Sequence, residues 1–148
     1  MTRRYPAILL LAASTLAAPG CKRNSDTGTP ATGTETATAQ ASIAEVQLGR
    51  HLSADKRVSD ATTTFSPRDT IYAVAVTQGS SPNATVTARW TYEEGGQVVK
   101  EDSRTIAASG TEATEFHISK PTGLPKGKYK VEVFLDSKSA GTKDFEVK

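Results

Sequence analysis

Few residues of this 148-residue chain have the types and the spacing that metal binding requires. The two histidines, His51 and His117, form neither a His-x-His nor an HExxH pattern, which are common arrangements of zinc ligands. His117 lies between Phe116 and Ile118 in an alternating segment, so we expect it on the outward side of a strand. We interpret both histidines as surface residues and predict no metal and no other cofactor. The alternative is a site completed by distant Asp or Glu residues.

Two acidic pairs, Glu93-Glu94 and Glu101-Asp102, bracket a predicted hairpin and offer carboxylates for acid–base chemistry. Paired carboxylates can hydrolyse glycosides, but charges at turns and strand edges are more often simply solvated. The chain has no G-x-S-x-G motif for a nucleophile, and Gly95-Gly96 is not followed by the lysine of a phosphate-binding loop. We therefore predict that the chain is not an enzyme and has no catalytic residues.

The single cysteine, Cys21, follows a segment with the features of a secretion signal. Residues 1–20 begin with basic residues, continue through an apolar run of 12 residues at 7–18, and end in small residues. That run is too short to cross a bilayer as a helix, so we predict a cleaved signal peptide over residues 1–20. A single cysteine excludes an internal disulfide and a multi-cysteine zinc site.

Ala18-Pro19-Gly20-Cys21 resembles the lipobox of bacterial lipoproteins, in which a small residue precedes the cysteine that becomes acylated. Gly20 and Cys21 match that pattern, whereas Ala18 and Pro19 depart from its commonest residues. The resemblance implies lipidation of Cys21 with fatty acyl chains such as palmitate, and anchoring in the bacterial cell envelope. Lys22 after the cysteine implies the outer membrane, with the protein facing the periplasm. The alternative is an ordinary secretory signal cut after Ala18, which leaves Cys21 as a free thiol.

The composition divides the rest of the chain into two parts. The segment from the cysteine at position 21 to residue 42 is dominated by Thr, Ala, Ser and Gly and has no large apolar residue, so we predict a flexible linker. We predict one folded domain over residues 43–148. Without residues 1–20 the net charge falls from +2 to 0, because Arg3 and Arg4 are lost. A neutral chain has no overall attraction to nucleic acid.

Residues 43–148 alternate between apolar and polar side chains at short intervals, which is typical of strands in an all-β fold. The segment 84–92 is the clearest case: Val86, Ala88, Trp90 and Tyr92 share one side of the predicted strand. We expect turns at 79–83, 93–96 and 136–141. The predicted strands are 44–48, 58–65, 70–77, 84–92, 97–101 with an extension at 103–107, 112–119, 128–135, and a last strand that contains Phe145 and Val147. Seven or eight such strands predict an antiparallel β-sandwich.

Two features of this pattern resemble immunoglobulin-like and fibronectin type III-like domains. Trp90 lies on the third strong strand, where immunoglobulin-like domains place a tryptophan between the two sheets. Residues 124–133 read LPKGKYKVEV, similar to the fibronectin type III run in which the tyrosine forms a tyrosine corner. The resemblance implies that Trp90 and Tyr129 are core residues, and it is nearly silent on function. The C-terminal hairpin is also similar to that of bacterial lipoproteins of uncharacterised function.

A candidate binding surface follows from the charges and one aromatic residue near the C-terminus. Lys126, Lys128 and Lys130 form a basic stripe at alternate positions, with Lys120 nearby. Such a stripe is either a solvated strand face or a contact for anionic headgroups or an acidic partner. Phe134 points opposite to its apolar neighbours, which makes it a candidate interface anchor. We expect partner contacts there and at the loops 79–83 and 120–127.

These observations favour a non-catalytic envelope lipoprotein whose anchored β-sandwich binds or scaffolds a protein partner. One alternative is an inhibitor or immunity protein against an envelope hydrolase, since a rigid loop presents binding residues at low entropic cost. Another is a glycan-binding module, for which we regard Phe134 as the one strong aromatic candidate. The partner and the oligomeric state are not specified by the sequence.

Overall fold

The computed structural model describes residues 40–148 of the chain. The predicted signal peptide, Cys21 and nearly all of the predicted linker therefore lie outside the described residues. Within the described residues, no helix is long and apolar enough to span a bilayer. The first strand begins at Ser42, and Gln40 forms an isolated bridge with Ser80.

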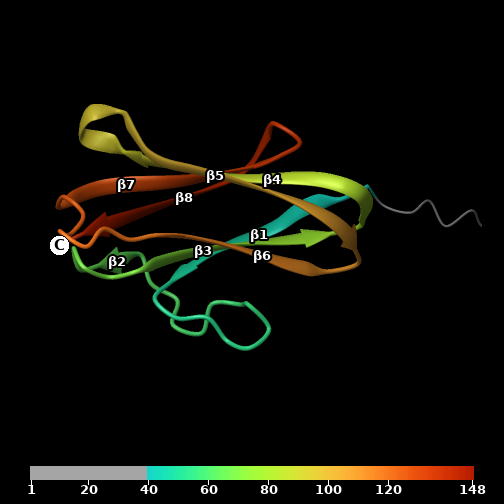
Figure 1. Cartoon of the computed structure of the whole chain (residues 1–148), viewed down its shortest axis with the longest axis horizontal. Helices are drawn as coiled ribbons and strands as arrows, with labels where there is room; N and C mark the ends of the chain where they lie inside the picture. Colours follow the sequence, from blue (N-terminus) through green and yellow to red (C-terminus); the bar gives the residue numbers. More distant parts are fainter. Residues whose placement is uncertain (1–39) are drawn as a thin grey trace, which may run out of the picture. The chain divides into compact units, whose positions relative to one another are not determined.

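Two β-sheets pack face to face, which confirms the predicted all-β, immunoglobulin-like sandwich (Figure 1). One sheet has three strands in the order β1-β3-β6, and the other has five in the order β2-β8-β7-β4-β5. One short 3₁₀ turn, η1, joins β4 to β5. The elements are β1 Ser42–Gly49, β2 Thr64–Phe65, β3 Ile71–Gln78, β4 Ser80–Tyr92, η1 Glu93–Gly95, β5 Gln97–Ser109, β6 Glu112–Ile118, β7 Gly127–Leu135 and β8 Lys138–Val147.

The strand pairing differs from a purely antiparallel sandwich at one place. β2 runs parallel to β8, with Thr64 opposite Glu146 and Phe65 opposite Val147. All other strand pairs are antiparallel. In constant-type immunoglobulin domains the strand that follows the third strand returns to the first sheet. Here β4 is the third long strand, and the strand that follows it, β5, pairs with β4 in the second sheet.

The core lies between the sheets and is centred on Trp90, as predicted. Trp90 is fully buried, and its ring lies edge-on to Phe145 with a centroid separation of 5.9 Å. Phe145 in turn stacks on Tyr129 at 5.2 Å and meets Phe65 edge-on at 5.6 Å. Aliphatic side chains from both sheets complete the core: Val46, Leu48, Ile71, Ala73, Ala75, Val86, Ala88, Ile118, Val131, Val133 and Val147. Such interlocking aromatic and branched side chains are typical of sandwich cores.

The tyrosine corner predicted at Tyr129 is confirmed. Its hydroxyl donates a 2.7 Å hydrogen bond to the carbonyl oxygen of Pro125, four residues earlier. Burial raises the pKa of Tyr129 above its ordinary value, so the phenol stays protonated and remains a donor. The bond fixes the loop before β7 against the core.

The predicted strand over 58–65 is wrong, because only Thr64–Phe65 is a strand and residues 50–63 form a long loop. The loop satisfies its backbone groups locally: Ser53 N–H donates to Arg57 O, and Thr62 N–H donates to Leu48 O of β1. Val58 N–H donates to the side chain of Gln47 rather than to a strand partner. These bonds replace the continuous pairing that a strand would need.

Two other boundaries differ from the sequence prediction. The expected loop 79–83 is reduced to a tight turn at Gly79, whose φ of 100° favours glycine, and β4 starts at Ser80. The expected strand 97–101 and its extension 103–107 form the single strand β5 of 13 residues. β5 is longer than predicted because it pairs with β4 along nearly its whole length, from Tyr92 opposite Gln97 to Ser80 opposite Ser109.

Candidate functional site

The loops of the sandwich gather at its two ends, and we call one of them the distal end. The chain enters the described fold at the other end, where Gln40 bridges Ser80. The distal end consists of residues 66–70, residues 93–96, residues 119–126 and Lys148 (Figure 1). Leu124 N–H donates to Pro67 O at 2.7 Å, and Lys148 N–H donates to Phe65 O at 2.9 Å. These backbone bonds hold the distal loops together.

The β4–β5 turn is tied to the loop before β7 through Tyr92. The Tyr92 hydroxyl lies 2.7 Å from the Glu94 carboxylate and 3.1 Å from the carbonyl oxygen of Lys126. The hydrogen bond to Glu94 raises the pKa of Tyr92 above its ordinary value. A Cβ on Gly127, which has a φ of 141°, would lie 2.8 Å from both Tyr92 and Glu94. Only glycine therefore permits this close approach.

Two adjacent valines are exposed at the start of β5. The exposed fraction is 52% for Val98 and 42% for Val99, and no other large hydrophobic residue in the range 40–148 is classed as exposed. Thr91 pairs with Val98 and Trp90 pairs with Lys100, so Val99 is the extra residue of a β-bulge. A bulge re-aims the side chains beside it, which leaves both valines in solvent. The sequence signal for this patch was the pair of consecutive valines in an alternating strand.

The valines border a shallow groove of about 230 Å³, which we call the hairpin groove. It is lined by Tyr92, Gln97, Val98, Val99, Lys120, Leu124, Pro125 and Tyr129. The loop 120–127, which we predicted as a partner contact, contributes three of these residues. The other predicted contact, 79–83, lies at the opposite end of the sandwich, in the turn and first residues of β4.

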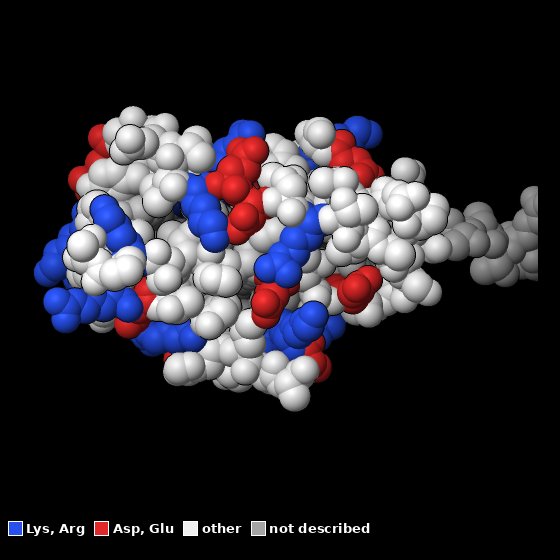
Figure 2. Space-filling model, viewed as in Figure 1, with Lys and Arg blue, Asp and Glu red and all other residues white. Residues whose placement is uncertain are grey.

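Basic residues surround the distal end. Figure 2 shows Lys and Arg side chains concentrated at this end of the molecule. Five basic residues belong to the distal segments or adjoin them: Arg68, Lys120, Lys126, Lys128 and Lys148. The acidic residues there are Asp69, Glu93, Glu94 and Glu146, and Glu146 pairs with Lys148 at 3.2 Å. The basic residues outnumber the acidic ones by one, and Lys120, which lines the apolar groove, and Lys126 in the same loop suit an acidic protein surface.

The predicted lysine stripe is divided between two environments. Lys126 is exposed in the loop before β7, whereas Lys128 and Lys130 lie on β7 itself. Lys128 is opposite Glu146 of β8 and Lys130 is opposite Asp144, so acidic residues interrupt the stripe on the strand. Lys126 is thus the member of the stripe that belongs to the distal end.

Phe134 lies far along β7 from Lys126, on the outer face of the five-stranded sheet. It is half-buried, and the guanidinium carbon of Arg89 lies 4.8 Å from the centroid of its ring. Arg89 also bonds to Glu101 of β5 with an Nε to Oε2 distance of 2.6 Å. The structure therefore does not bring Phe134 together with the loop lysines, and it covers part of the ring with Arg89.

The carboxylates singled out from the sequence do not converge. Glu101 faces outward to Arg89, whereas Asp102 faces inward and pairs with Lys100 at 2.7 Å. Lys100 also donates to the carbonyl oxygen of His117 on β6. The hydrogen bond from Lys100 lowers the pKa of Asp102 below its ordinary value, so it is a poor proton donor at neutral pH.

The histidines lie on different elements. His51 is exposed in the loop after β1, and His117 is exposed on β6, where its ring lies 5.7 Å from that of Tyr72. In the described part of the chain, no three His, Cys, Asp or Glu residues are grouped so that they could hold a metal ion.

Comparison with known proteins gives a fold but no family. No protein-family model matches the chain, and no curated protein sequence matches it. Among solved structures, it is similar to an immunoglobulin-like protein of Pseudomonas aeruginosa, with 16% identity and a TM-score of 0.50, covering 76% of this chain and 99% of that one.

Two larger proteins contain a similar domain. A Paenibacillus cycloisomaltooligosaccharide glucanotransferase matches with 20% identity and a TM-score of 0.52, over 72% of this chain and 14% of that one. An alkylpurine DNA glycosylase of Pseudomonas fluorescens matches with 14% identity and a TM-score of 0.51, over 76% of this chain and 31% of that one. The present chain thus spans a small part of each enzyme, and such identities show the fold alone.

Proposed function

We propose that this protein is a lipid-anchored, non-catalytic protein of the bacterial envelope whose distal end binds a protein partner. The anchor is inferred from Gly20-Cys21 at the end of the predicted signal peptide, and Lys22 favours the outer membrane facing the periplasm. Several acyl chains, each contributing about 0.8 kcal/mol per buried CH₂, would hold the protein durably in the membrane.

The observation that carries the binding proposal is the exposure of Val98 and Val99 beside the hairpin groove. Because both valines are exposed, their side chains add little buried apolar area to the fold. An apolar centre surrounded by polar residues is the usual anatomy of a protein interface. The basic residues around the groove favour a partner with an acidic surface and an apolar side chain that enters the groove.

The position of the distal end supports this assignment. Gln40, through which the chain leaves the fold toward the predicted anchor, lies at the opposite end of the sandwich. The loops farthest from that exit carry the candidate site, and loops positioned by a rigid scaffold commonly carry binding residues. The Tyr92 hydroxyl, whose single hydrogen is shared between the Glu94 carboxylate and the Lys126 carbonyl oxygen, holds the groove in one shape before a partner arrives.

The absence of catalysis is part of the proposal and is supported by the geometry of the acidic residues. Glu101 and Asp102 face opposite sides of β5, and each is paired with a cation. Glu93 and Glu94 lie in an exposed turn, where solvent weakens any effect on a reacting group. Catalysis requires a nucleophile or base oriented toward a shared point, and these residues do not supply one.

The test is crosslinking in cells with affinity-tagged protein, followed by mass spectrometry. We expect one stoichiometric partner with the wild-type chain, and its loss with Val98→Ser/Val99→Ser. The matched control is Ala107→Ser, which changes another exposed position of the same strand. A partner that stays bound to the valine variant, or the absence of any partner, would reject the distal end as the binding site.

The anchor is tested separately with Cys21→Ser. We expect this variant to leave the membrane fraction while it keeps the fold and the partner in solution. Retention of the variant in membranes would contradict lipidation at Cys21. The two results are independent, because the serine replacement does not touch the distal end.

A second candidate function, inhibition of an envelope hydrolase, is favoured by the β4–β5 hairpin. Figure 1 shows this hairpin projecting beyond its neighbouring strands at the distal end. A rigid hairpin with two exposed valines at its base suits insertion into an enzyme cleft. Purified protein should then reduce the activity of one hydrolase in a panel, and Val98→Ser/Val99→Ser should abolish that effect.

A further inference from the structure

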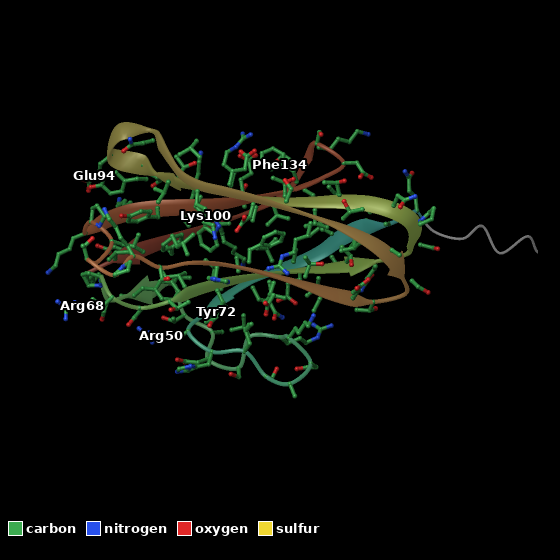
Figure 3. The ribbon with its side chains drawn as sticks, in the orientation of Figure 1. Arg50, Arg68, Tyr72, Glu94, Lys100 and Phe134 are labelled. Carbon is green, nitrogen blue, oxygen red and sulfur yellow. The ribbon has the colours of Figure 1, made fainter. Side chains whose placement is uncertain are left out.

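A second hollow lies beside the three-stranded sheet, apart from the hairpin groove. It has a volume of about 430 Å³, which is within the range of small-molecule sites. The residues that follow β1, the residues that precede β3 and the start of β3 form its walls. It is lined by Arg50, His51, Arg68, Asp69, Thr70 and Tyr72. Figure 3 places Arg50, Arg68 and Tyr72 along one margin of the molecule, away from Phe134. We call it the arginine hollow.

Arg50 is held rigidly at this hollow. Its Nε donates to Asp69 Oδ2 at 3.0 Å, and one terminal nitrogen donates to the carbonyl oxygen of Thr64 at 2.7 Å. Its guanidinium also lies 5.6 Å from the ring centroid of Phe65, and its other terminal nitrogen is 3.7 Å from Asp60. A guanidinium fixed from several sides can donate its remaining hydrogens to a ligand with little loss of entropy.

Asp69 is fixed just as firmly and keeps one oxygen free. Its Oδ2 accepts from Ser66 N–H at 2.8 Å as well as from Arg50. Within residues 40–148 its Oδ1 has no hydrogen-bond partner. The backbone bond from Ser66, together with Arg50, keeps the pKa of Asp69 below its ordinary value, so it is an acceptor at neutral pH. Arg50 and Asp69 thus present a donor and an acceptor side by side.

An aromatic ring completes the hollow. Tyr72 is half-buried on the outer face of β3 and leans against His117 of β6 at a centroid distance of 5.7 Å. Within the described chain its hydroxyl has no hydrogen-bond partner. A ring with an apolar face and a free polar tip can pack against a ligand and also bond to it.

The remaining lining residue, Arg68, supplies charge. It is exposed, and no acidic residue of the described chain pairs with it. Arg50 already faces Asp69 and Asp60, so Arg68 is the arginine of the hollow that has no ion-pair partner among the described residues. A compact anion of high charge such as phosphate would lie close to the Asp69 carboxylate, which opposes its binding. A ligand with hydroxyls, an apolar ring face and one carboxylate fits all the groups.

We propose that the arginine hollow binds a sugar unit that carries a carboxylate. The ring of the sugar packs on Tyr72, two neighbouring hydroxyls bond to Arg50 and Asp69, and the carboxylate pairs with Arg68. The site shares Arg68, Asp69 and Thr70 with the distal segment 66–70, but it is separate from the hairpin groove and does not depend on a protein partner. In this proposal the aromatic contact for a glycan is Tyr72, and not Phe134, which was the aromatic candidate from the sequence.

The experiment is a two-dimensional NMR titration of the purified chain in its Cys21→Ser form. The probes are glucuronic acid, glucose, acetate and inorganic phosphate, each in turn. We expect glucuronic acid to shift the amide signals of residues 68–72 and 117 saturably, at least tenfold more tightly than the other three. Absence of these shifts, or equal binding of glucose, acetate or phosphate, overturns the proposal.

Variants assign the effect to the hollow. Arg68→Ala, at an exposed position that cannot disrupt the core, should weaken glucuronic acid binding at least tenfold. Tyr72→Phe should weaken it less, because the ring is kept. The matched control is Arg57→Ala, a partly exposed arginine of the 50–63 loop that lies 3.9 Å from Asp55, which should leave binding unchanged. Equal losses with Arg57→Ala and Arg68→Ala would show that only general charge matters and would reject the site.

Discussion

Arg89 on β4 lies across the ring of Phe134 on β7, with its guanidinium carbon 4.8 Å from the ring centroid. The same guanidinium bonds to Glu101 on β5 at 2.6 Å, so one side chain links three adjacent strands of the sheet. An aromatic residue that points outward is therefore partly covered by its own sheet. This arrangement gives Phe134 a structural role that does not require a partner.

Removing the Arg89–Phe134 contact should destabilise the fold slightly. A double-mutant cycle of Arg89→Ala and Phe134→Ala should give a coupling free energy of about 0.5–1 kcal/mol, as for exposed cation–π pairs. Urea unfolding measures it. Arg89→Lys is the comparison, since lysine keeps the charge but not the planar stacking. A coupling of zero would show that the two side chains are neighbours without interaction.

Trp90 should be the most sensitive core position. Trp90→Ala removes a fully buried ring that contacts Phe145, and we expect a loss of about 3–5 kcal/mol in the free energy of unfolding. Trp90→Phe should lose less, because the indole N–H has no hydrogen-bond partner in the described structure and its removal relieves a buried donor. Equal losses for the two variants in urea would contradict this reading of the indole N–H.

The contribution of the tyrosine corner to stability can be measured by removing a single oxygen atom. Tyr129→Phe removes the bond to Pro125 O and leaves the ring in place, so we expect a loss of about 0.5–1.5 kcal/mol. Tyr72→Phe is the matched control, because its hydroxyl has no partner within the described residues, and it should change stability by less. The free energies of unfolding in urea would distinguish the two variants. A Tyr129→Phe variant as stable as wild type would show that the tyrosine corner does not stabilise the fold.

Asp69 should make stability depend on pH. The backbone bond from Ser66, and then Arg50, lowers the pKa of Asp69 in the folded state below the value near 3.9 of an unfolded chain. Its contribution is therefore present above about pH 4 and is lost as the pH falls through the lower folded value. Wild type should exceed Asp69→Asn in stability at pH 7, and the gap should narrow as the pH falls below 4. A gap that stays constant between pH 7 and pH 2.5 would refute the linkage.

The fold was predictable where short sequence patterns fix it. The alternation around Trp90 and the LPKGKYKVEV run are local signals, and the structure places both residues as expected. The strand predicted over 58–65 failed because alternation continued in a segment whose backbone groups bond to β1 and to the loop itself. Alternation predicts which side chains share a face, but not whether a neighbouring strand is within reach.

The site was predictable only in part for a related reason. The loop 120–127 was predicted as a contact because it connects strands at one end of the sandwich, and it lines the hairpin groove. The exposure of Val98 and Val99 depends on the bulge opposite Trp90 and Thr91, which is a property of strand pairing. Arg50 finds its partners at Thr64 and Asp69, 14 and 19 positions away, after a loop that no local pattern describes.

The inward side of β5 has a consequence for how neighbouring molecules behave. β5 is the edge of its sheet, and its side chains toward the other sheet include Lys100, Asp102 and Arg104, opposite Trp90, Ala88 and Val86. Lys100 reaches across to His117 O, and Arg104 lies over the ring of Phe116. If an edge strand of a second molecule paired with β5, the sandwich would continue past β5, and these charged side chains would be buried away from water at a cost in free energy. If the proposed anchor confines copies of the protein to one membrane plane, they would therefore collide and separate without joining their sheets.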